Sequence, residues 1–298
     1  MAGLQRFEHA LLRVNNLEKA VDFYKHVMDL PEIAREGGVV YFGCGFDGNY
    51  DLAVVEGGTG VSRFAVRVDS EEDIQRYEKK LNDQGVQSER INQREPGVEY
   101  GIRFLLPSNV TMELVAVEDN RYHRPSDPPV RPGRTAITPL DADHINLMSL
   151  DVKKDAEFLT EVLGYYLSDV KSTEAGYWAQ AFTRQGNYHH DVAISASSNP
   201  QYNLHHYAMT MANFEHMKLF CDKLSQSGYQ LELGLSRHIT ASNLFLYFWE
   251  PGGNRIELCC EMGTLSPNTP TRFTEAGINT FTAWGGITAP PTFITKGS

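Results

Sequence analysis

Short apolar runs and amphipathic segments alternate along the second half of the chain. Residues 153–163 and 214–227 gather their apolar side chains on one side of a helix, which predicts a helix in each segment. The other runs are short and bounded by turn residues, so we predict strands there. These runs are HINLMSL, YWAQAFTR, DVAISA, HHYAMTM, LELGLS, LFLYFWE and NRIELCC. Strands that come in groups between helices favour an α+β fold over a doubly wound parallel sheet.

The first half of the chain repeats this plan. A shift of 135 residues places His9 on His144, and a shift of 144 places Glu113 on Glu257. A slowly changing shift is the result of loop insertions in a duplicated sequence. Each half in turn contains a strand, a helix and a group of strands twice. We therefore predict four βαβββ modules, two in each of two tandem domains.

A proline-rich segment separates the halves. VEDNRYHRPSDPPVRPGRTAITPLDAD holds five of the fourteen prolines of the chain. Neither a helix nor a central strand tolerates prolines at this density. We place the domain boundary in this linker, with one domain at residues 1–133 and the other at residues 134–298, the latter ending in a C-terminal tail.

Composition and charge exclude several classes of protein. The 298 residues carry a formal net charge of −11 and no basic stripe, so nucleic acid is not an expected partner. No apolar run approaches the roughly 18 residues of a membrane span, and no secretory signal is visible at the start. The cysteines have neither disulfide-framework nor zinc-site spacing, which favours a cytoplasmic location. They are Cys44, Cys221, Cys259 and Cys260.

Three potential metal ligands stand on strand faces that are otherwise poor in such groups. Glu257 lies in an apolar strand after the predicted turn EPGGN, where a buried carboxylate is costly unless a positive charge meets it. His144 and His206 begin two other repeat units, and each is the lone strong ligand on its face. One such histidine alone is usually a hydrogen-bonded core residue. Two histidines and one carboxylate are typical of non-haem Fe(II) oxygenases.

Other polar side chains occur near these units. His189 and His190 stand at the head of the strand DVAISA, and we expect His189 to be a surface-loop residue. His238 precedes Tyr247 by nine residues. Taken singly, His190, His238 and Tyr247 are as easily structural hydrogen-bonding residues as catalytic ones.

The segment RHITASNLFLYFWEPGGNRIE is similar to the signature of the type I extradiol ring-cleavage dioxygenases. These are the catechol 2,3-dioxygenase-like enzymes of the vicinal oxygen chelate superfamily. The shared features are a histidine, a Leu-Tyr pair after seven residues, an acidic residue with a proline, a Gly-Gly pair and the glutamate. DHINL, HDVAIS and LHHYAM resemble the other characteristic segments, in the family's order. The resemblance covers residues 7–261, and it departs from the signature at Ser236, which is not a ligand position.

The resemblance implies a fold and a metal. In that fold the βαβββ modules form a curved, barrel-like sheet, with a non-catalytic N-terminal domain and a metal-binding catalytic C-terminal domain. The implied ligands are His144, His206 and Glu257. The implied ion is Fe(II), with Mn(II) as the minority choice. Such enzymes cleave a catechol-type substrate with O2 during the degradation of aromatic compounds, and they usually form homo-oligomers.

The resemblance also implies roles for the neighbouring residues. His190 would exchange a proton with the bound oxygen species, while His238 and Tyr247 would orient and polarise the diol oxygen. Asn146 would support the oxygen site. The tail, with Phe281 and Trp284, is expected to help keep water out.

Two other functions are compatible with parts of this pattern. One is another metalloenzyme of the same superfamily, such as a glyoxalase-like isomerase or an epimerase. These usually lack the set formed by His190, His238 and Tyr247. The other is a non-catalytic small-molecule binding protein, which would leave three ligand-type side chains in register without a reason.

The repeat alignment names the counterparts of the site in the first half. The position of His206 is taken by Arg63, which has no lone pair to give a metal. We therefore expect Arg63 to pair with Glu113, and a single ion per chain, held in the second half. The counterparts of His238 and Tyr247 are Arg94 and Arg103.

Overall fold

The computed structural model describes residues 4–91, 95–120, 130–131, 133–277 and 281–298. The first domain begins with β1 (Leu4–Val14), α1 (Leu17–His26), β2 (Glu32–Glu36), β3 (Val39–Phe42) and β4 (Leu52–Glu56). It continues with β5 (Val61–Val68), α2 (Glu71–Asp83), β6 (Ser88–Ile91), β7 (Val98–Leu105) and β8 (Thr111–Val117). Each of these two series is one βαβββ module.

The second domain has the same order of elements. Its first module contains β9 (Asp141–Ser149), α3 (Val152–Glu157), β10 (Tyr166–Ser172), β11 (Trp178–Arg184) and β12 (Val192–Ala196). Its second contains β13 (Leu204–Thr210), α4 (Phe214–Gln226), β14 (Leu233–Arg237), β15 (Leu244–Trp249) and β16 (Arg255–Cys260). The tail adds β17 (Arg272–Glu275) and α5 (Pro291–Thr295). The predicted α+β class with four βαβββ modules is confirmed.

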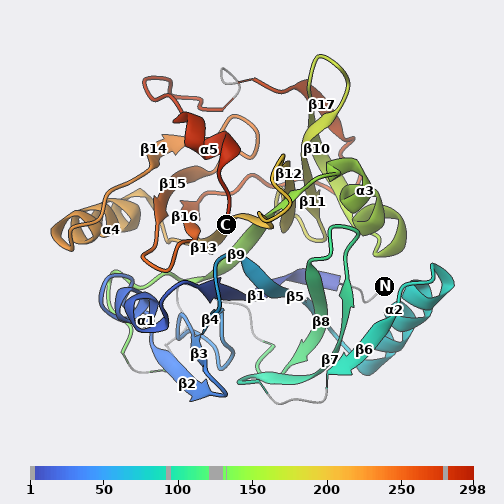
Figure 1. Ribbon diagram of the computed structural model, residues 1–298, viewed down its shortest axis with the longest axis horizontal. Helices are drawn as coiled ribbons and strands as arrows, with labels where there is room; N and C mark the ends of the chain where they lie inside the picture. The colour runs from blue at the N-terminus through green and yellow to red at the C-terminus, as the bar shows by residue number, and fades with distance from the viewer. Residues whose placement is uncertain (1–3, 92–94, 121–129, 132, 278–280) are drawn as a thin grey trace.

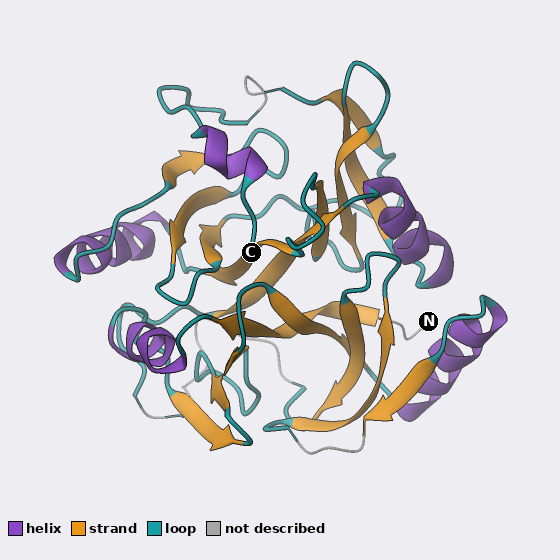
Figure 2. Cartoon of the chain, viewed as in Figure 1, coloured by secondary structure: helices purple, strands orange, loops and turns teal. Residues whose placement is uncertain are grey.

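Each domain is built on one curved sheet (Figure 2). The strand order is β2-β3-β4-β1-β5-β8-β7-β6 in the first and β14-β15-β16-β13-β9-β12-β11-β10-β17 in the second. Within each module the first strand pairs parallel with the last, and the first strands of the two modules pair antiparallel at the middle of the sheet. The first strands of the modules are thus central, which brings distant segments into one register.

Two elements differ from the sequence prediction. β10 was not predicted, because the mixture of polar and apolar residues in YLSDVKS hides its burial. β17 pairs with it in parallel, so β10 is an inner strand of the sheet and not its edge. The helix predicted at residues 153–163 is α-helical only to Glu157 and continues as a π-helix over Phe158–Val162. Thr160 donates its hydroxyl hydrogen bond back to Ala156 O at 3.0 Å, a contact that distorts helices.

The helices pack where the domains meet. α1 and α4 lie on one side of the molecule and α2 and α3 on the other (Figure 1). Phe23 of α1 contacts Tyr229, after α4, and Phe248 of β15, with ring centroids 4.8 and 5.8 Å apart. One continuous apolar core includes residues of both domains. None of the helices in the described part of the chain is long and apolar enough to cross a membrane.

The predicted hairpin that carries Glu257 is formed by β15 and β16 and anchored to the first domain. The buried Glu250 carboxylate accepts hydrogen bonds from the backbone N–H groups of Gly252 and Asn254. Asn254 also donates to Arg13 O at 2.8 Å and accepts from Gly60 N at 2.7 Å. A Cβ on Gly252 would lie 2.6 Å from a methyl group of Val14, so this close approach requires glycine. The first domain therefore holds the turn in place.

Candidate metal centre and active site

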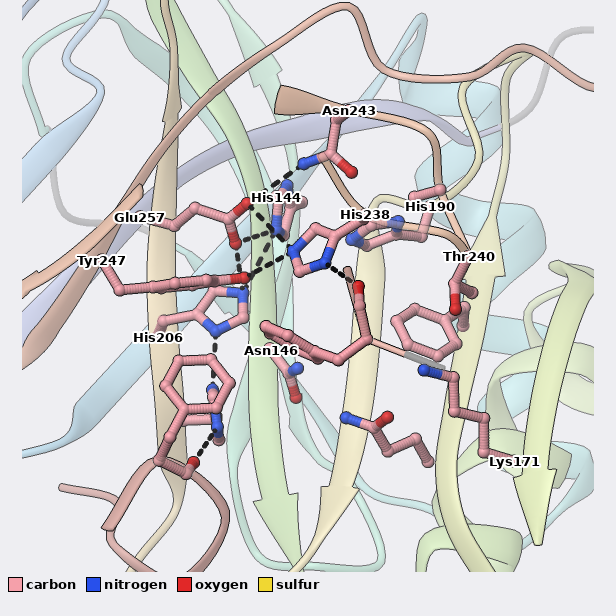
Figure 3. A pocket seen from close by; sticks show the side chains of 16 residues that line it. His144, Asn146, Lys171, His190, His206, His238, Thr240, Asn243, Tyr247 and Glu257 are labelled. Atoms are coloured by element: carbon pink, nitrogen blue, oxygen red, sulfur yellow. Dashed lines mark hydrogen bonds and ion pairs between the residues drawn. The ribbon is translucent and has the colours of Figure 1, made fainter. Parts of the chain in front are cut away.

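Strand register gathers the candidate ligands on one face of the second sheet. Ala208 of β13 lies between His144 of β9 and Glu257 of β16, paired with both. His206 lies two residues before Ala208 and points to the same side. Tyr247 lies directly opposite Glu257 on β15. Residues more than 100 positions apart thus meet at the inner surface of the sheet (Figure 3).

Three donor atoms form a compact triangle there. His144 Nε2 lies 3.2 Å from His206 Nε2 and 3.3 Å from Glu257 Oε2. His206 Nε2 lies 3.0 Å from the same carboxylate oxygen. All three residues are buried, and together they form a group with metal-ligand chemistry.

The triangle fits a six-coordinate divalent ion. An ion with ligand bonds of about 2.1 Å keeps neighbouring donor atoms about 3.0 Å apart. The three observed separations, 3.0 to 3.3 Å, match one face of such an octahedron. The three residues would hold such an ion from one side only, which would leave room for further ligands on the other. Two imidazole nitrogens and one carboxylate oxygen suit a first-row transition metal such as Fe(II) or Mn(II).

Hydrogen bonds orient both histidines for this purpose. His144 Nδ1 donates to Asp143 Oδ1 at 2.6 Å, and Asp143 Oδ2 accepts from the Thr210 hydroxyl at 2.6 Å. His205 Nε2 donates to Phe293 O at 2.8 Å, which leaves its Nδ1 to accept from His206 Nδ1 at 2.7 Å. Each candidate ligand histidine therefore has its Nδ1 engaged in a hydrogen bond and its Nε2 turned toward the other donor atoms.

The charges of the triad are strongly coupled. Burial raises the pKa of Glu257, but His144 and His206 outweigh it and hold that pKa well below its usual range. Burial lowers the pKa of His144, but Glu257 and Asp143 outweigh it and raise it to about 10. The carboxylate is therefore ionised. An ion at His144 Nε2 would release the proton held there, as metal binding does. Asn243 donates to the second carboxylate oxygen, Oε1, at 3.1 Å.

His190 stands beside the triad. Its ring centroid lies 4.3 Å from that of His144, and burial followed by the charge of His144 lowers its pKa well below the ordinary value. His190 Nδ1 lies 3.0 Å from His189 Nδ1, and His189 Nε2 lies 2.5 Å from Asp169 Oδ2. The last bond fixes the proton of His189 on Nε2, so its Nδ1 accepts from His190. This arrangement leaves Nε2 of His190 with a lone pair.

The expectation that His189 is a surface-loop residue is wrong. Its side chain is only 3% exposed, because β17 folds along β10 and the tail closes over it. His189 N donates to Gly263 O at 2.8 Å, and Arg272 of β17 contacts Asp169 at 2.5 Å. The tail therefore buries the histidine pair at the head of β12.

His238 and Tyr247 form a second hydrogen-bonded pair. His238 Nδ1 donates to Phe281 O at 3.3 Å, so its Nε2 accepts from the Tyr247 hydroxyl at 3.0 Å. Burial, followed by Glu257, raises the pKa of Tyr247 well above its usual value. Burial lowers the pKa of His238 to about 4. Both side chains are therefore neutral and act through hydrogen bonds.

The predicted site residues line one cavity of about 40 Å³. They include Asn146, whose Oδ1 accepts a hydrogen bond from Ser195 at 3.0 Å. The tail contributes Phe281 and Phe293 to the lining. The expectation for Trp284 is wrong, because this side chain is 53% exposed and is not part of the lining. A larger cavity of about 340 Å³ adjoins the first and shares several of its lining residues.

Sequence reasoning missed several residues of the site. Asp143 and His205 are each next to a ligand, so their adjacency to His144 and His206 was an available signal. Asn243 and Lys171 carried no such signal, because only the tertiary structure brings them to the cavity.

The first domain has strand positions equivalent to those of the candidate ligands, but different side chains occupy some of them. His9, Ala65 and Glu113 lie side by side as their counterparts do. The predicted pairing of Arg63 with Glu113 is confirmed, with Nε 3.4 Å from Oε1. Arg103 is closer to the same oxygen, at 2.8 Å.

Glu95 is an unforeseen member of this group. It forms an ion pair with Arg63 and accepts from the Tyr50 hydroxyl at 2.5 Å. His9, Glu95 and Glu113 lie close enough to form a second cluster of ligand-type side chains. The guanidinium groups of Arg63 and Arg103 already supply positive charge to it. Arg94 lies outside the described residues.

Replacing Arg63 with alanine is expected to lower the free energy of unfolding while leaving the metal site of the second domain intact. The loss should be about 3 kcal/mol, the lower end of the range for removing one partner of a buried ion pair, since Arg103 still contacts Glu113. Urea denaturation and metal analysis measure the two effects. The control Arg35→Ala removes exposed contacts with Glu18 and Glu32, which are screened by solvent, so its effect on the free energy of unfolding should be much smaller than that of Arg63→Ala. Equal losses in the two variants would contradict the role of Arg63.

Comparison with known proteins identifies the class. The family model of the Glyoxalase/Bleomycin resistance protein/Dioxygenase superfamily matches residues 6–114 and 141–258. The protein belongs to this superfamily.

Individual members that it resembles are dioxygenases. It is 26% identical over 272 residues to a manganese-dependent 2,3-dihydroxybiphenyl 1,2-dioxygenase of Geobacillus genomosp. 3, covering 86% of this chain and 85% of the relative. It is 27% identical over 269 residues to a metapyrocatechase of Pseudomonas sp. (strain CF600), covering 87% and 86%.

Solved structures show the same fold. The 2,3-dioxygenase LapB from Pseudomonas sp. KL28 superposes with a TM-score of 0.83 at 25% identity, covering 92% of this chain and 98% of that one. Homoprotocatechuate 2,3-dioxygenase from Arthrobacter globiformis gives a TM-score of 0.85 at 22% identity, covering 100% and 92%.

Proposed function

We propose that the protein is an extradiol dioxygenase. It opens the aromatic ring of a catechol-type substrate with O2, beside the two hydroxyls rather than between them. The observation that carries this proposal is the shared cavity: the triad of His144, His206 and Glu257 faces His190 on one side and Tyr247 on the other. An isomerase or a passive binding protein of the same superfamily would have no use for this whole set.

The proposed cofactor is one Fe(II) per chain, with Mn(II) as the second choice. When bound, the ion supplies a Lewis acid that favours the catechol anion and a redox-active centre with room for the diol and O2. The separation of the donor atoms and the approach of both Nε2 atoms to the Glu257 carboxylate support a divalent ion of either kind. Reconstitution of metal-free protein with each ion, followed by turnover, distinguishes them.

The surrounding side chains position the substrate. The Tyr247 hydroxyl and His238 form a hydrogen-bonded pair beside Glu257, at a distance of 3.0 Å from each other. They are suited to hold one diol oxygen and to polarise it. Asn146, on the same face as His144, is proposed to support the oxygen-binding side of the cavity.

His190 is proposed to move the proton. Its Nδ1 is occupied by His189, and its low pKa keeps the ring neutral, so Nε2 carries a lone pair that faces the cavity. A group that takes a proton from the substrate and returns it later is a general acid–base catalyst. The aromatic rings of Phe182, Phe281 and Phe293 close the cavity and limit the access of water.

The wider setting follows from the sequence and is part of the proposal. We infer that the enzyme is cytoplasmic, that it takes part in the degradation of aromatic compounds and that it assembles as a homo-oligomer. The four cysteines are free thiols in the structure, which is compatible with a reducing compartment. The net charge of −11 argues against nucleic acid as a partner.

Both atoms of labelled O2 are expected in the ring-opened product. A cleavage beside the diol gives a yellow ring-fission product that carries an aldehyde or ketone and a carboxylate. Mass spectrometry after fast quenching measures the label, and a reaction with unlabelled O2 in labelled water controls for exchange. A muconic acid, opened between the hydroxyls, would overturn the proposal.

A further inference from the structure

A lysine stands at the junction of the two cavities. Lys171 of β10 lines both the cavity at the triad and the larger one of about 340 Å³. Its side chain extends toward the middle of the pocket from the side opposite Glu257 (Figure 3). A substrate whose ring lies at the triad and whose substituent enters the larger cavity would extend along the residues that the two cavities share, and Lys171 is one of them.

Lys171 is buried without a carboxylate in direct contact with its amino group. The residue is 7% exposed, and within the described parts of the chain no hydrogen bond or ion pair of its amino group is found. The charge of Asp169 acts on Lys171, but this carboxylate already accepts from His189 and Arg272 through its two oxygens. The ring of Phe182 lies 5.9 Å from the ammonium nitrogen. Burial lowers the pKa of Lys171 to about 8, which agrees with this poorly compensated charge.

The cavity walls offer nothing to balance the charge. Among the described residues that line the two cavities, the only carboxylate is Glu257, which is engaged by His144 and His206. The outer part of the larger cavity is mostly apolar, and its lining includes Ala179, Ala196, Ala276, Ala289 and Ile294. Burying an unpaired charge in such surroundings is costly. The position of this lysine therefore points to an anion that arrives with the ligand.

We propose that Lys171 is a specificity residue for catechols that carry a carboxylate on a short side chain. This inference rests on the proposed function. The ring would occupy the cavity at the triad, the apolar part of the side chain would lie along the larger cavity, and the carboxylate would meet the Lys171 ammonium. A charge-assisted hydrogen bond in a buried site then supplies the selectivity. Neutral catechols would leave the ammonium unpaired.

The test compares a catechol bearing a propionate side chain with its methyl ester, each with the side chain at ring position 3 or 4. We expect the acid to have a kcat/KM about 10-fold to 100-fold above that of the ester, as for a hydrogen bond to a charged group. Dissociation constants, measured without O2 on the metal-loaded protein, should show the same preference. Lys171→Met should abolish or reverse it, and Lys171→Arg should keep most of it. Lys153→Met, at an exposed lysine of α3, is the matched control.

The outcomes separate this inference from the proposed function. Cleavage of both compounds with equal kcat/KM and equal affinity, unchanged in Lys171→Met, would overturn the role of Lys171 and leave the dioxygenase proposal intact. Tighter binding of the acid that is lost in Lys171→Met supports the role of Lys171, even if no catechol is cleaved. Failure to cleave every catechol would count against the dioxygenase proposal instead.

Discussion

Replacing His144, His206 or Glu257 with alanine, one at a time, is expected to abolish both metal binding and turnover. Each residue contributes one of three donor atoms that lie 3.0 to 3.3 Å apart. Two remaining donors cannot hold the ion in a fixed position. The loss of activity should exceed the roughly 100-fold that removal of a residue orienting a ligand can cost. Metal analysis after anaerobic reconstitution and assays of catechol cleavage measure both effects.

The repeat provides a matched control for this experiment. His9 occupies the position of His144 in the first domain and is equally buried. His9→Ala removes an imidazole from the same place in the same fold, so it should cost stability but keep one ion per chain and full turnover. A ligand variant that retains both its ion and its activity would refute the assignment. A second ion per chain, lost in Glu113→Ala, would refute the inference that the first domain holds none.

Changing His190 to asparagine or phenylalanine is expected to lower kcat by about 10²-fold or more, as for the loss of an acid–base group, with little change in KM. The reason is the free Nε2, whose availability depends on the bond between Nδ1 and His189. Steady-state kinetics with one catechol at saturating O2 measures the two constants.

His216→Asn is the control for His190, because His216 is also buried but binds Ile137 O and Ala212 N away from the cavity. Its kcat should stay within a few fold of the unmodified protein. If His190 variants keep kcat and only raise KM, the residue positions the substrate and transfers no proton.

The geometry of the triad shows what strand periodicity can predict. Side chains two residues apart on a strand point to the same face. This period showed that His144, His206 and Glu257 are each the one strong ligand on a face of their own strand. The duplicated sequence then aligned His9 and Glu113 with two of them, and the structure has this register in both sheets. Such predictions succeed because they depend on local geometry and on a repeat that the chain itself displays.

The failures have a common physical cause. His189 was expected at the surface and is buried, and β10 was not predicted. In both cases the covering comes from the tail, whose β17 and α5 return to the second sheet from a great distance along the chain. Glu95 was missed for a related reason, because it meets Arg63 only through the folding of the first domain and no periodic pattern in the sequence predicts that contact.

The sequence by itself determined the α+β class, the duplication, the candidate ligands and the substitution of Arg63 for a ligand in the first domain. These features follow from residue identity, from the two-residue period of strands and from the internal repeat. Only the tertiary structure decided which neighbours surround the ligands: the proton positions on His190 and His206, the cover supplied by the tail, and the unpaired Lys171 at the cavity. Burial and hydrogen-bond partners depend on segments that meet in space, and the energy of a charged group depends on those partners more than on its own position in the chain.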